Sequence, residues 1–359
     1  MSELRWDPLK NSWVIMSLGD SRRPQQFLQK RQGPCEPPSS DYERLQMQDA
    51  HCPLCSGNEG RTAPEIIAFR PQGSAPNEPG WQVRVIPNKF PAVQIEGDLD
   101  NRAEGLYDRM NGIGAHELII ETPDHNKSLA DLSESEITDV LKAYRSRMLD
   151  LRKDSRFRYI FIFKNHGVGT SSNISHAHSQ LMAVPLVPPL ISNELEYCRR
   201  HFQQKERCLI CDLIYQEQQN KSRIVSDDGN FIVYAPYASR FPFETMIAPL
   251  AHHHDFAQQS DQQLGFLART LRDILRRVRS TLRDPAYSMI LHSAPPTHPR
   301  MGRPNFWESL PHDYHWHIEL APKLTRLTGF EWGFGFHINP TPPEEAAEFL
   351  RSAEPELKR

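Results

Sequence analysis

The sequence lacks both a long hydrophobic run and a strong charge of either sign. No segment approaches the roughly 18 apolar residues that a membrane-spanning helix needs, and the first ten residues, MSELRWDPLK, have no apolar core of the kind found in signal peptides. The formal net charge is only −3 over 359 residues, so no global field attracts nucleic acid or an anionic membrane. We therefore expect a cytoplasmic protein that binds neither nucleic acid nor membrane, and any phosphate-bearing ligand must be held by local groups.

Cysteine is also scarce, with six residues in the chain. Four of them form two C-x2-C pairs, which are Cys52 with Cys55 and Cys208 with Cys211. In a chain without a secretion signal, this spacing favours metal binding or a redox dithiol over structural disulfides. The other two, Cys35 and Cys198, are interpreted as ordinary thiols.

Two segments lack a sustained hydrophobic period. Residues 22–50 are rich in proline, glutamine and charge, and residues 293–313 are rich in proline. We expect both to be long loops, the first as a partly mobile arm. Irregular segments of this length are uncommon in compact domains and are often functional.

Two helices are predicted from hydrophobic residues that recur every three to four positions. One runs from Ile137 to Leu151 and the other from Leu264 to Leu282. Each is preceded by a serine with Glu or Gln three residues later, the pattern of a capping box. Runs of β-branched and aromatic residues predict four strands, at residues 115–121, 157–164, 243–249 and 287–292.

The same series of motifs occurs in both halves of the chain. A C-x2-C pair is followed by a glutamate, a histidine eight positions later, a serine after eight more, a helix, a strand and an H-x-H motif. The single residues of this series are Glu117, His125 and Ser133 in the first half and Glu244, His252 and Ser260 in the second. We therefore predict an α+β fold of two duplicated units, residues 1–190 and 191–359, each pairing an amphipathic helix with a mostly antiparallel sheet.

Each half also contains the donors for a metal site. Two thiolates and two imidazoles suit tetrahedral zinc, and we predict two structural zinc sites. The ligands are Cys52, Cys55, His125 and His176 in the first site and Cys208, Cys211, His252 and His315 in the second. His253 and His254 are alternatives to His252, which the equal glutamate-to-histidine spacing favours. Four protein ligands leave no position open for a reacting water.

His178 is the predicted catalytic residue. Alternate side chains of a strand share one face, so zinc on His176 leaves the His178 ring nearby as a nucleophile or general base. Residues 164–173 carry glycines, hydroxyls and amides that can turn donors toward phosphate oxygens, and Ser179 and Gln180 add neutral donors. This pattern suits attack on phosphorus. The alternative is a core histidine that only hydrogen-bonds a carbonyl group.

The chain resembles the galactose-1-phosphate uridylyltransferase family of the histidine-triad superfamily. The similarity covers nearly the whole sequence, and the motifs occur in the family's order. They are WVIMS at 13–17 with Arg23-Pro24, CPLCSGN at 52–58, RVIPNKFP at 84–91, AHELIIETPDH at 115–125, HAHSQ at 176–180 and FEWGFGFHINP at 330–340. The resemblance implies duplicated histidine-triad-like units and metal at the four positions assigned to the first site.

The activity implied by the resemblance is a ping-pong nucleotidyl transfer, with UDP-glucose:hexose-1-phosphate uridylyltransferase as the first candidate. His178 attacks the α-phosphorus of a nucleotide-sugar and expels a sugar 1-phosphate, and the nucleotide then passes to a phosphate acceptor. Gln180 bonds the phosphoryl oxygens. Hydrolytic members of the superfamily carry a third histidine there, so transfer is favoured over hydrolysis of dinucleoside polyphosphates. The family commonly forms homodimers.

Further residues are implied to contact the substrate, and some depart from the family's pattern. The matching positions are Asn88, the loop residues Ser171, Ser172 and Asn173, and Arg23, which is near a family arginine that is Asp20 here. Asn173 itself replaces a serine. An aromatic-glutamate pair that holds hexose hydroxyls is replaced by Phe334 and Gly335.

The second candidate activity is that of the plant ADP-glucose phosphorylase branch, in which an adenylyl group passes to inorganic phosphate. The second cysteine pair and the segment Tyr314-His315-Trp316 resemble this branch more closely. The identity of the nucleotide base is therefore open. His317 is followed by Ile318-Glu319 and is expected to be structural or a poor metal ligand. A zinc protein that binds nucleotides without catalysis is a further alternative.

Overall fold

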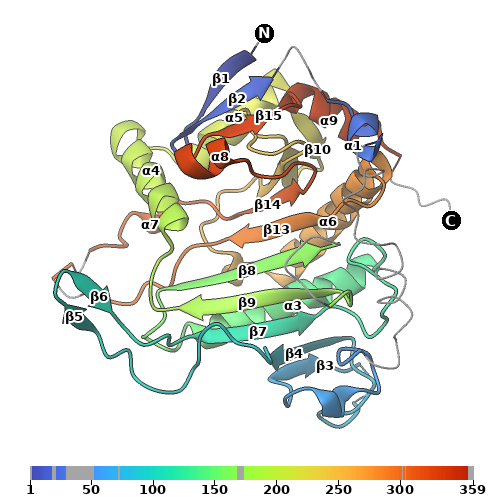
Figure 1. Ribbon diagram of the computed structural model, residues 1–359, viewed down its shortest axis with the longest axis vertical. Coiled ribbons are helices and arrows are strands. Elements are labelled where there is room, and N and C mark those ends of the chain that lie inside the picture. The colour runs from blue at the N-terminus through green and yellow to red at the C-terminus, as the bar shows by residue number, and fades with distance from the viewer. Residues whose placement is uncertain are drawn as a thin grey trace.

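A computed structural model describes residues 2–17, 22–29, 52–71, 73–167, 174–300, 302–303 and 305–354. Within these ranges the strands form a sheet of ten strands, a sheet of three and a two-stranded hairpin (Figure 1). Helices cover the large sheet, so the predicted α+β class is confirmed.

The ten-stranded sheet is antiparallel throughout and contains strands from both halves of the chain. In spatial order, the strands are β10 (Ile224–Asp227), β11 (Phe231–Tyr234), β12 (Thr245–Pro249), β14 (His317–Pro322), β13 (Tyr287–His292), β8 (Tyr159–His166), β9 (His178–Val184), β7 (Ala115–Ile120), β4 (Val83–Pro87) and β3 (Ile67–Phe69). The halves meet where β13 pairs with β8, with Met289 opposite Lys164. The division into units 1–190 and 191–359 stays a prediction.

The strand order shows the duplication expected from the repeated motifs. From the centre outward, the first half runs β8, β9, β7, β4, β3 and the second runs β13, β14, β12, β11, β10. Strand β7 is followed along the chain by helix α3 (Glu134–Leu151), and β12 is followed by helix α6 (Asp261–Leu282). Equivalent strands therefore occupy equivalent places on either side of the central β8–β13 pair.

Helices α3 and α6 begin directly after the predicted capping serines, three residues before the first apolar residue of each period, and pack together behind the sheet (Figure 1). Both capping boxes are present, with Ser133 and Glu136 at α3 and Ser260 and Gln263 at α6. The apolar stripe of α6 belongs to the same core as α3 and the strands, and Leu271 is only 1% exposed. Full burial of a leucine side chain contributes about 2 kcal/mol, so the two helices fix the sheet that carries the site.

Smaller elements surround this core. Strands β1 (Ser2–Asp7), β2 (Ser12–Ser17) and β15 (His337–Asn339) form the three-stranded sheet, and β5 (Arg102–Glu104) and β6 (Tyr107–Arg109) form the hairpin. The remaining α-helices in the described ranges are α1 (Pro24–Gln29), α4 (Pro189–Lys205), α5 (Leu209–Asn220), α7 (Leu310–Asp313), α8 (Gly329–Phe334) and α9 (Pro343–Ser352), with 3-10 turns η4 (Glu59–Arg61) and η5 (Phe256–Gln258).

Each of the two segments predicted to be long loops contains a short helix. Residues 22–50 begin with α1, and residues 30–50 of that segment lie outside the described residues. Of residues 293–313, the described ones (293–300, 302–303 and 305–309) contain no helix or strand before α7, apart from a bridge between Arg300 and Arg303. Cys198 is buried without a disulfide, whereas Cys35 lies outside the described ranges. Within those ranges, no helix has both the length and the hydrophobicity required to cross a membrane.

Candidate active site and metal centres

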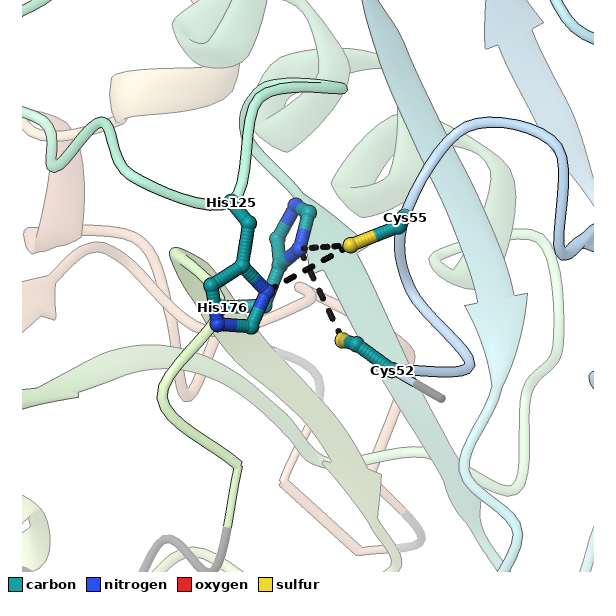
Figure 2. A group of neighbouring side chains, drawn as sticks. All are labelled: Cys52, Cys55, His125 and His176. Atoms are coloured by element: carbon teal, nitrogen blue, oxygen red, sulfur yellow. Dashed lines mark hydrogen bonds between the residues drawn. The ribbon is translucent and has the colours of Figure 1, made fainter. Parts of the chain in front are cut away.

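The first cysteine pair meets two histidines beside the start of β9. Figure 2 shows the side chains of Cys52, Cys55, His125 and His176 converging, and their four donor atoms lie within 4.8 Å of one another. The Nδ1 atom of His176 is 3.7 Å from the Cys52 sulfur and 3.5 Å from the Cys55 sulfur. The Nδ1 atom of His125 is 3.4 Å from the Cys55 sulfur. These four side chains could hold a metal ion.

The backbone fixes the orientation of the His176 ring. Its Nε2–H donates to the carbonyl oxygen of Thr122 at 2.7 Å, which leaves the Nδ1 lone pair directed at the sulfurs. Burial lowers the pKa of His176 to about 4, so the ring is neutral, as a metal ligand must be. His176 precedes β9, which begins only at His178. The expectation that both histidines lie on the strand is therefore wrong for His176, which lies two residues before β9 begins.

His178 is directly linked to this group through the backbone. Its ring is 6% exposed, and its Nδ1–H donates to the carbonyl oxygen of His176 at 2.7 Å. This bond places the lone pair of the neutral ring on Nε2. The pKa of His178 is lowered, first by burial and also by the positive charge of Lys164. A neutral imidazole at physiological pH is the form that can act as a nucleophile.

A buried ion pair beneath His178 was not found from the sequence. Lys164 on β8 pairs with Glu121 at 2.7 Å and donates to the carbonyl oxygen of His178 at 3.2 Å. The hydroxyl of Ser179 donates to the other oxygen of Glu121 and contacts the Tyr144 hydroxyl. Ser179 therefore points into the core and not toward a ligand beside His178, which corrects its expected role. Its alternation with His178 along β9 is the signal that predicts opposite faces.

His116 is a second residue that sequence reasoning missed. Its Nδ1 accepts a hydrogen bond from the backbone N–H of Ala92 at 3.1 Å, so its Nε2 carries the proton. That Nε2–H donates to the Oε1 atom of Gln180 at 2.9 Å. The bond fixes the amide of Gln180, whose NH2 group then faces away from His116. In the sequence, His116 is one of three polar residues in the predicted strand 115–121, beside Glu117 and Glu121, and no pattern there distinguishes it.

Of the other residues expected to bind the substrate, only Asn88 lies beside Gln180 in the described part of the chain. The side-chain nitrogen of Asn88 lies 3.0 Å from Nε2 of His116, so Asn88 belongs to the same group as Gln180. Arg23 is exposed just before α1, and among the described residues no hydrogen bond or ion pair links its side chain to this group. The loop residues Ser171, Ser172 and Asn173 lie outside the described ranges.

The second half brings together an equivalent set of side chains. Donor atoms of Cys208, Cys211, His252 and His315 lie within 4.8 Å of one another. Both histidines place Nδ1 at 3.3 Å from the Cys211 sulfur. The Nε2–H of His252 donates to the carbonyl oxygen of Pro311 at 2.9 Å, whereas Nε2 of His315, the counterpart of His176, has no hydrogen-bond partner among the described residues. This group too could hold a metal ion.

His317 does not reproduce the surroundings of His178. It is fully buried, and its ring stacks on that of His292 with centroids 4.6 Å apart. Together with Glu194 these histidines form a third group able to hold a metal ion. Burial opposes the charge on Glu194, yet the two histidines and Tyr314 lower its pKa to about 2. Burial opposes a positive charge on His292, but the charge of Glu194 outweighs burial and raises the pKa of His292. A proton on His292 can therefore balance the charge of Glu194.

Comparison with known proteins identifies the family. Sequence models of the N-terminal and C-terminal domains of galactose-1-phosphate uridyl transferase match residues 1–188 and 193–354. The chain belongs to this family. A family relative, an ADP-glucose phosphorylase of Arabidopsis thaliana, is 34% identical over 353 residues, which are 97% of this chain and 92% of the relative. A galactose-1-phosphate uridylyltransferase of Thermotoga maritima is 27% identical over 368 residues, covering 99% and 100%.

The fold agrees with solved structures of the family. A crystal structure of an ADP-glucose phosphorylase from Arabidopsis thaliana with bound ADP-glucose superposes with a TM-score of 0.77 and 30% identity, and the match covers 99% of each chain. These family members are nucleotidyltransferases.

Proposed function

We propose that this protein transfers a nucleotidyl group through a covalent nucleotidyl-His178 intermediate. The observation that carries the proposal is the bond from Nδ1–H of His178 to the carbonyl oxygen of His176, because it leaves Nε2 as the nucleophilic nitrogen. In the first step, a bond forms between Nε2 and the α-phosphorus of a nucleotide-sugar, and the bond to the sugar 1-phosphate oxygen breaks. In the second step, an oxygen of the acceptor phosphate attacks the same phosphorus and His178 leaves.

Neutral donors around His178 would stabilise the reacting phosphoryl group. His116 fixes the amide of Gln180 so that its NH2 group is the end available to phosphoryl oxygens. Asn88 lies beside this pair and is proposed to contact the nucleotide. Ser171, Ser172 and Asn173 are proposed to complete the phosphate contacts, and Arg23 to approach the substrate from the N-terminal segment.

We propose that zinc occupies both Cys2His2 groups. With Zn–S near 2.3 Å and Zn–N near 2.1 Å, tetrahedral angles separate sulfur and nitrogen by about 3.6 Å. The sulfur–nitrogen distances of 3.4–3.7 Å in the first group and 3.3 Å in the second are close to that value. The metal would be structural, holding His176 and so aiming His178, while the protein side chains carry out the transfer.

Two substrate pairs remain candidates for this site. The first is UDP-glucose with a hexose 1-phosphate, the activity named for most of the family. The second is ADP-glucose with inorganic phosphate, and two observations favour it: the assembled second Cys2His2 group and the 34% identity to the Arabidopsis enzyme. The uridylyltransferases carry a glutamate that binds the hexose at the position of Gly335. Among the described residues other than its chain neighbours, no atom lies within 4 Å of the place that a Cβ atom would occupy there.

Trapping the intermediate tests the mechanism and identifies the base together. The metal-loaded protein is incubated separately with UDP-glucose and with ADP-glucose, digested at alkaline pH to preserve the phosphorus–nitrogen bond, and analysed by mass spectrometry. We expect uridylyl or adenylyl on the peptide that contains His178, and none in His178→Ala. No adduct from either substrate would contradict the mechanism. Steady turnover without an acceptor would instead indicate a hydrolase.

We also propose a homodimer in the cytoplasm. Support for self-association comes from exposed aromatic residues in and around α8, where Trp332 is 85% exposed and Phe334 is 72% exposed. Exposed apolar side chains that gather on one surface often mark a protein–protein contact. Light scattering at assay concentration should give twice the mass of one chain, and the mass of a monomer would exclude the proposal.

A further inference from the structure

A cavity of about 470 Å³ lies at the end of the sheet opposite to His178. Its walls are the turn at residues 185–187 after β9, helices α4 and α7, and the residues Arg300, Phe306, Trp307 and Ser309. Strand β9 has seven residues, from His178 to Val184, before this turn, so at about 3.3 Å per residue the cavity is about 20 Å from the His178 backbone. It is therefore distinct from the proposed active site.

Three arginines reach this cavity, and two of them have no acidic partner. Arg199 pairs with Glu196, but Arg158 and Arg300 form no ion pair within the described part of the chain. The guanidinium carbon of Arg300 instead lies 4.0 Å from the centroid of Phe306 and 4.7 Å from that of Trp307. Stacking on aromatic rings positions a guanidinium group without using its N–H donors, which stay available to an acceptor.

Two buried donors beside the cavity also lack acceptors. Within the described ranges, neither Nη1 of Arg158 nor the indole nitrogen of Trp307 has a hydrogen-bond partner. A buried donor without an acceptor is costly. An anion in the cavity would satisfy both donors and would neutralise the excess of positive charge.

The charge of the lining supports an anionic ligand. The cavity has two carboxylates, Glu196 and Asp313, against its three arginines, and Glu196 is already occupied by Arg199 and lies 3.7 Å from Arg200. A further guanidinium, that of Arg303, lies 5.8 Å from the Phe306 ring. Burial lowers the pKa of Arg300, and the positive charges of Arg158, Arg303 and Arg199 lower it further.

The position of the cavity in the duplicated fold is informative. The connection from β13 to β14 supplies Phe306, Trp307 and Arg300 to the cavity. In the duplicated fold, this connection is equivalent to the one from β8 to β9 in the first half. In the second half, His317 is fully buried and its Nε2 faces Glu194 at 3.9 Å, so no histidine nucleophile faces the cavity. The residues around the cavity can therefore bind a ligand but cannot react with it through a histidine.

We propose that this cavity is a second ligand site that binds a small phosphate-bearing molecule without reacting with it. The phosphate group bonds the guanidinium groups of Arg158 and Arg300, which suit bidentate contacts with phosphate oxygens. The rest of the molecule contacts the apolar walls at Leu186 and Trp307. The proposal does not depend on the proposed function, because it uses none of the residues around His178.

Chemical modification of individual arginines tests the site directly. The full-length protein is treated with phenylglyoxal at constant ionic strength in chloride, inorganic phosphate or phenyl phosphate, and modification is followed by peptide mass spectrometry. Either phosphate should slow modification of Arg158 and Arg300 by about tenfold relative to chloride, with phenyl phosphate acting at lower concentration if the apolar walls contribute. Arg269, an exposed arginine on α6 that pairs with Glu134 at 3.4 Å, should be unaffected.

Variants distinguish a site from general screening by phosphate. Arg300→Gln should raise the Kd for phosphate measured at Arg158 by about tenfold, since one charge-assisted hydrogen bond is lost. Arg269→Gln is the matched control and should leave that Kd unchanged. If Arg300→Gln does not fold, Arg158→Gln is read at Arg300 instead. Equal protection of all three arginines, or an unchanged Kd in the cavity variant, would overturn the proposal.

Discussion

The two halves of the molecule use one strand and helix arrangement but surround their H-x-H motifs with different chemistry. In the first half, the residue two positions after the second histidine is Gln180, a neutral amide oriented by His116. In the second half, the equivalent residue is Glu319, a buried carboxylate that pairs with Arg240 at 2.7 Å and with Lys10. A negative charge at that position would repel a phosphoryl group, whereas an amide can donate to it.

The second histidines of the two H-x-H motifs also have different surroundings. His178 keeps a short bond of 2.7 Å to the carbonyl oxygen of the first histidine, while the corresponding distance at His317 is 3.2 Å. His317 is surrounded by Glu194 and His292. The duplicated backbone therefore supplies a scaffold and a Cys2His2 group able to hold a metal ion twice. In the proposed mechanism, the residues after the second histidine support nucleotidyl transfer in the first half alone.

The largest expected difference between the halves is in catalysis. His178→Ala should lower kcat by about 10^4-fold or more, because it removes the nucleophile. His317→Asn should leave kcat within about threefold, since His317 does not contact the substrate in the proposed mechanism. Steady-state kinetics with the substrate identified by trapping measures both, with circular dichroism to confirm folding. Comparable losses in the two variants would show that the second half takes part in catalysis.

Exchange of charge at the equivalent positions sharpens the comparison. Gln180→Glu should lower kcat by about 10^3-fold, because it places a carboxylate against the phosphoryl oxygens. Glu319→Gln should leave kcat nearly unchanged but lower the free energy of unfolding by about 3 kcal/mol, since Lys10 and Arg240 lose their buried partner. Kinetics and urea unfolding of both proteins measure the two effects. A large decrease of kcat in Glu319→Gln would contradict the assignment of a structural role to Glu319 and a catalytic role to Gln180.

Removing one metal ligand from each half tests which centre supports the active site. Cys52→Ser and Cys208→Ser should each lose one equivalent of zinc and about 2 kcal/mol of unfolding free energy. Cys52→Ser should also lower kcat, because His176 would no longer hold the carbonyl that orients His178. Mass spectrometry of bound metal, thermal unfolding and kinetics provide the measurements. Equal metal content in the variants and the unchanged protein would exclude these cysteines as ligands.

Local patterns predicted much of the fold and both metal groups. Helices α3 and α6 were predictable because each combines an apolar period with a capping box, and β13 has the predicted bounds. The two Cys2His2 groups followed from the repeated order of motifs, although the ligands Cys52 and His176 are 124 positions apart. Repetition within one chain made these distant contacts visible.

Contacts between unrelated positions were not predictable from such patterns. The pairing of Lys164 with Glu121 and the bond from His116 to Gln180 depend on which strands become neighbours. Glu194 is 98 positions from its partner His292 and lies on α4, which has no expected role in the site. The position of His176 before the strand was missed because it depends on the cysteines that its ring must reach.

The smallest predicted effect concerns a contact that joins the two halves. Arg279 on α6 bonds Asp131, which precedes α3, at 2.7 Å. Burial opposes ionisation of Asp131, but hydrogen bonds from Arg279 and Ser128 outweigh it and lower its pKa from 3.8 to about 2. The folded-state pKa lies below the unfolded value, so this contact stabilises the protein fully above pH 3.8 and loses its contribution as the pH falls through about 2.

Asp131→Asn should therefore lower the free energy of unfolding by about 1 kcal/mol at neutral pH, after allowing for screening by solvent. The difference from the unchanged protein should stay constant down to about pH 5 and then shrink with further acidification, because protonation removes the same charge. Urea unfolding of both proteins between neutral pH and about pH 3 measures it. Asp273→Asn is a matched control, since Asp273 pairs with Arg277 within α6 at 2.7 Å and joins no separate elements. A difference that grows on acidification would contradict the assigned sign and the role of Asp131 in holding the two halves together.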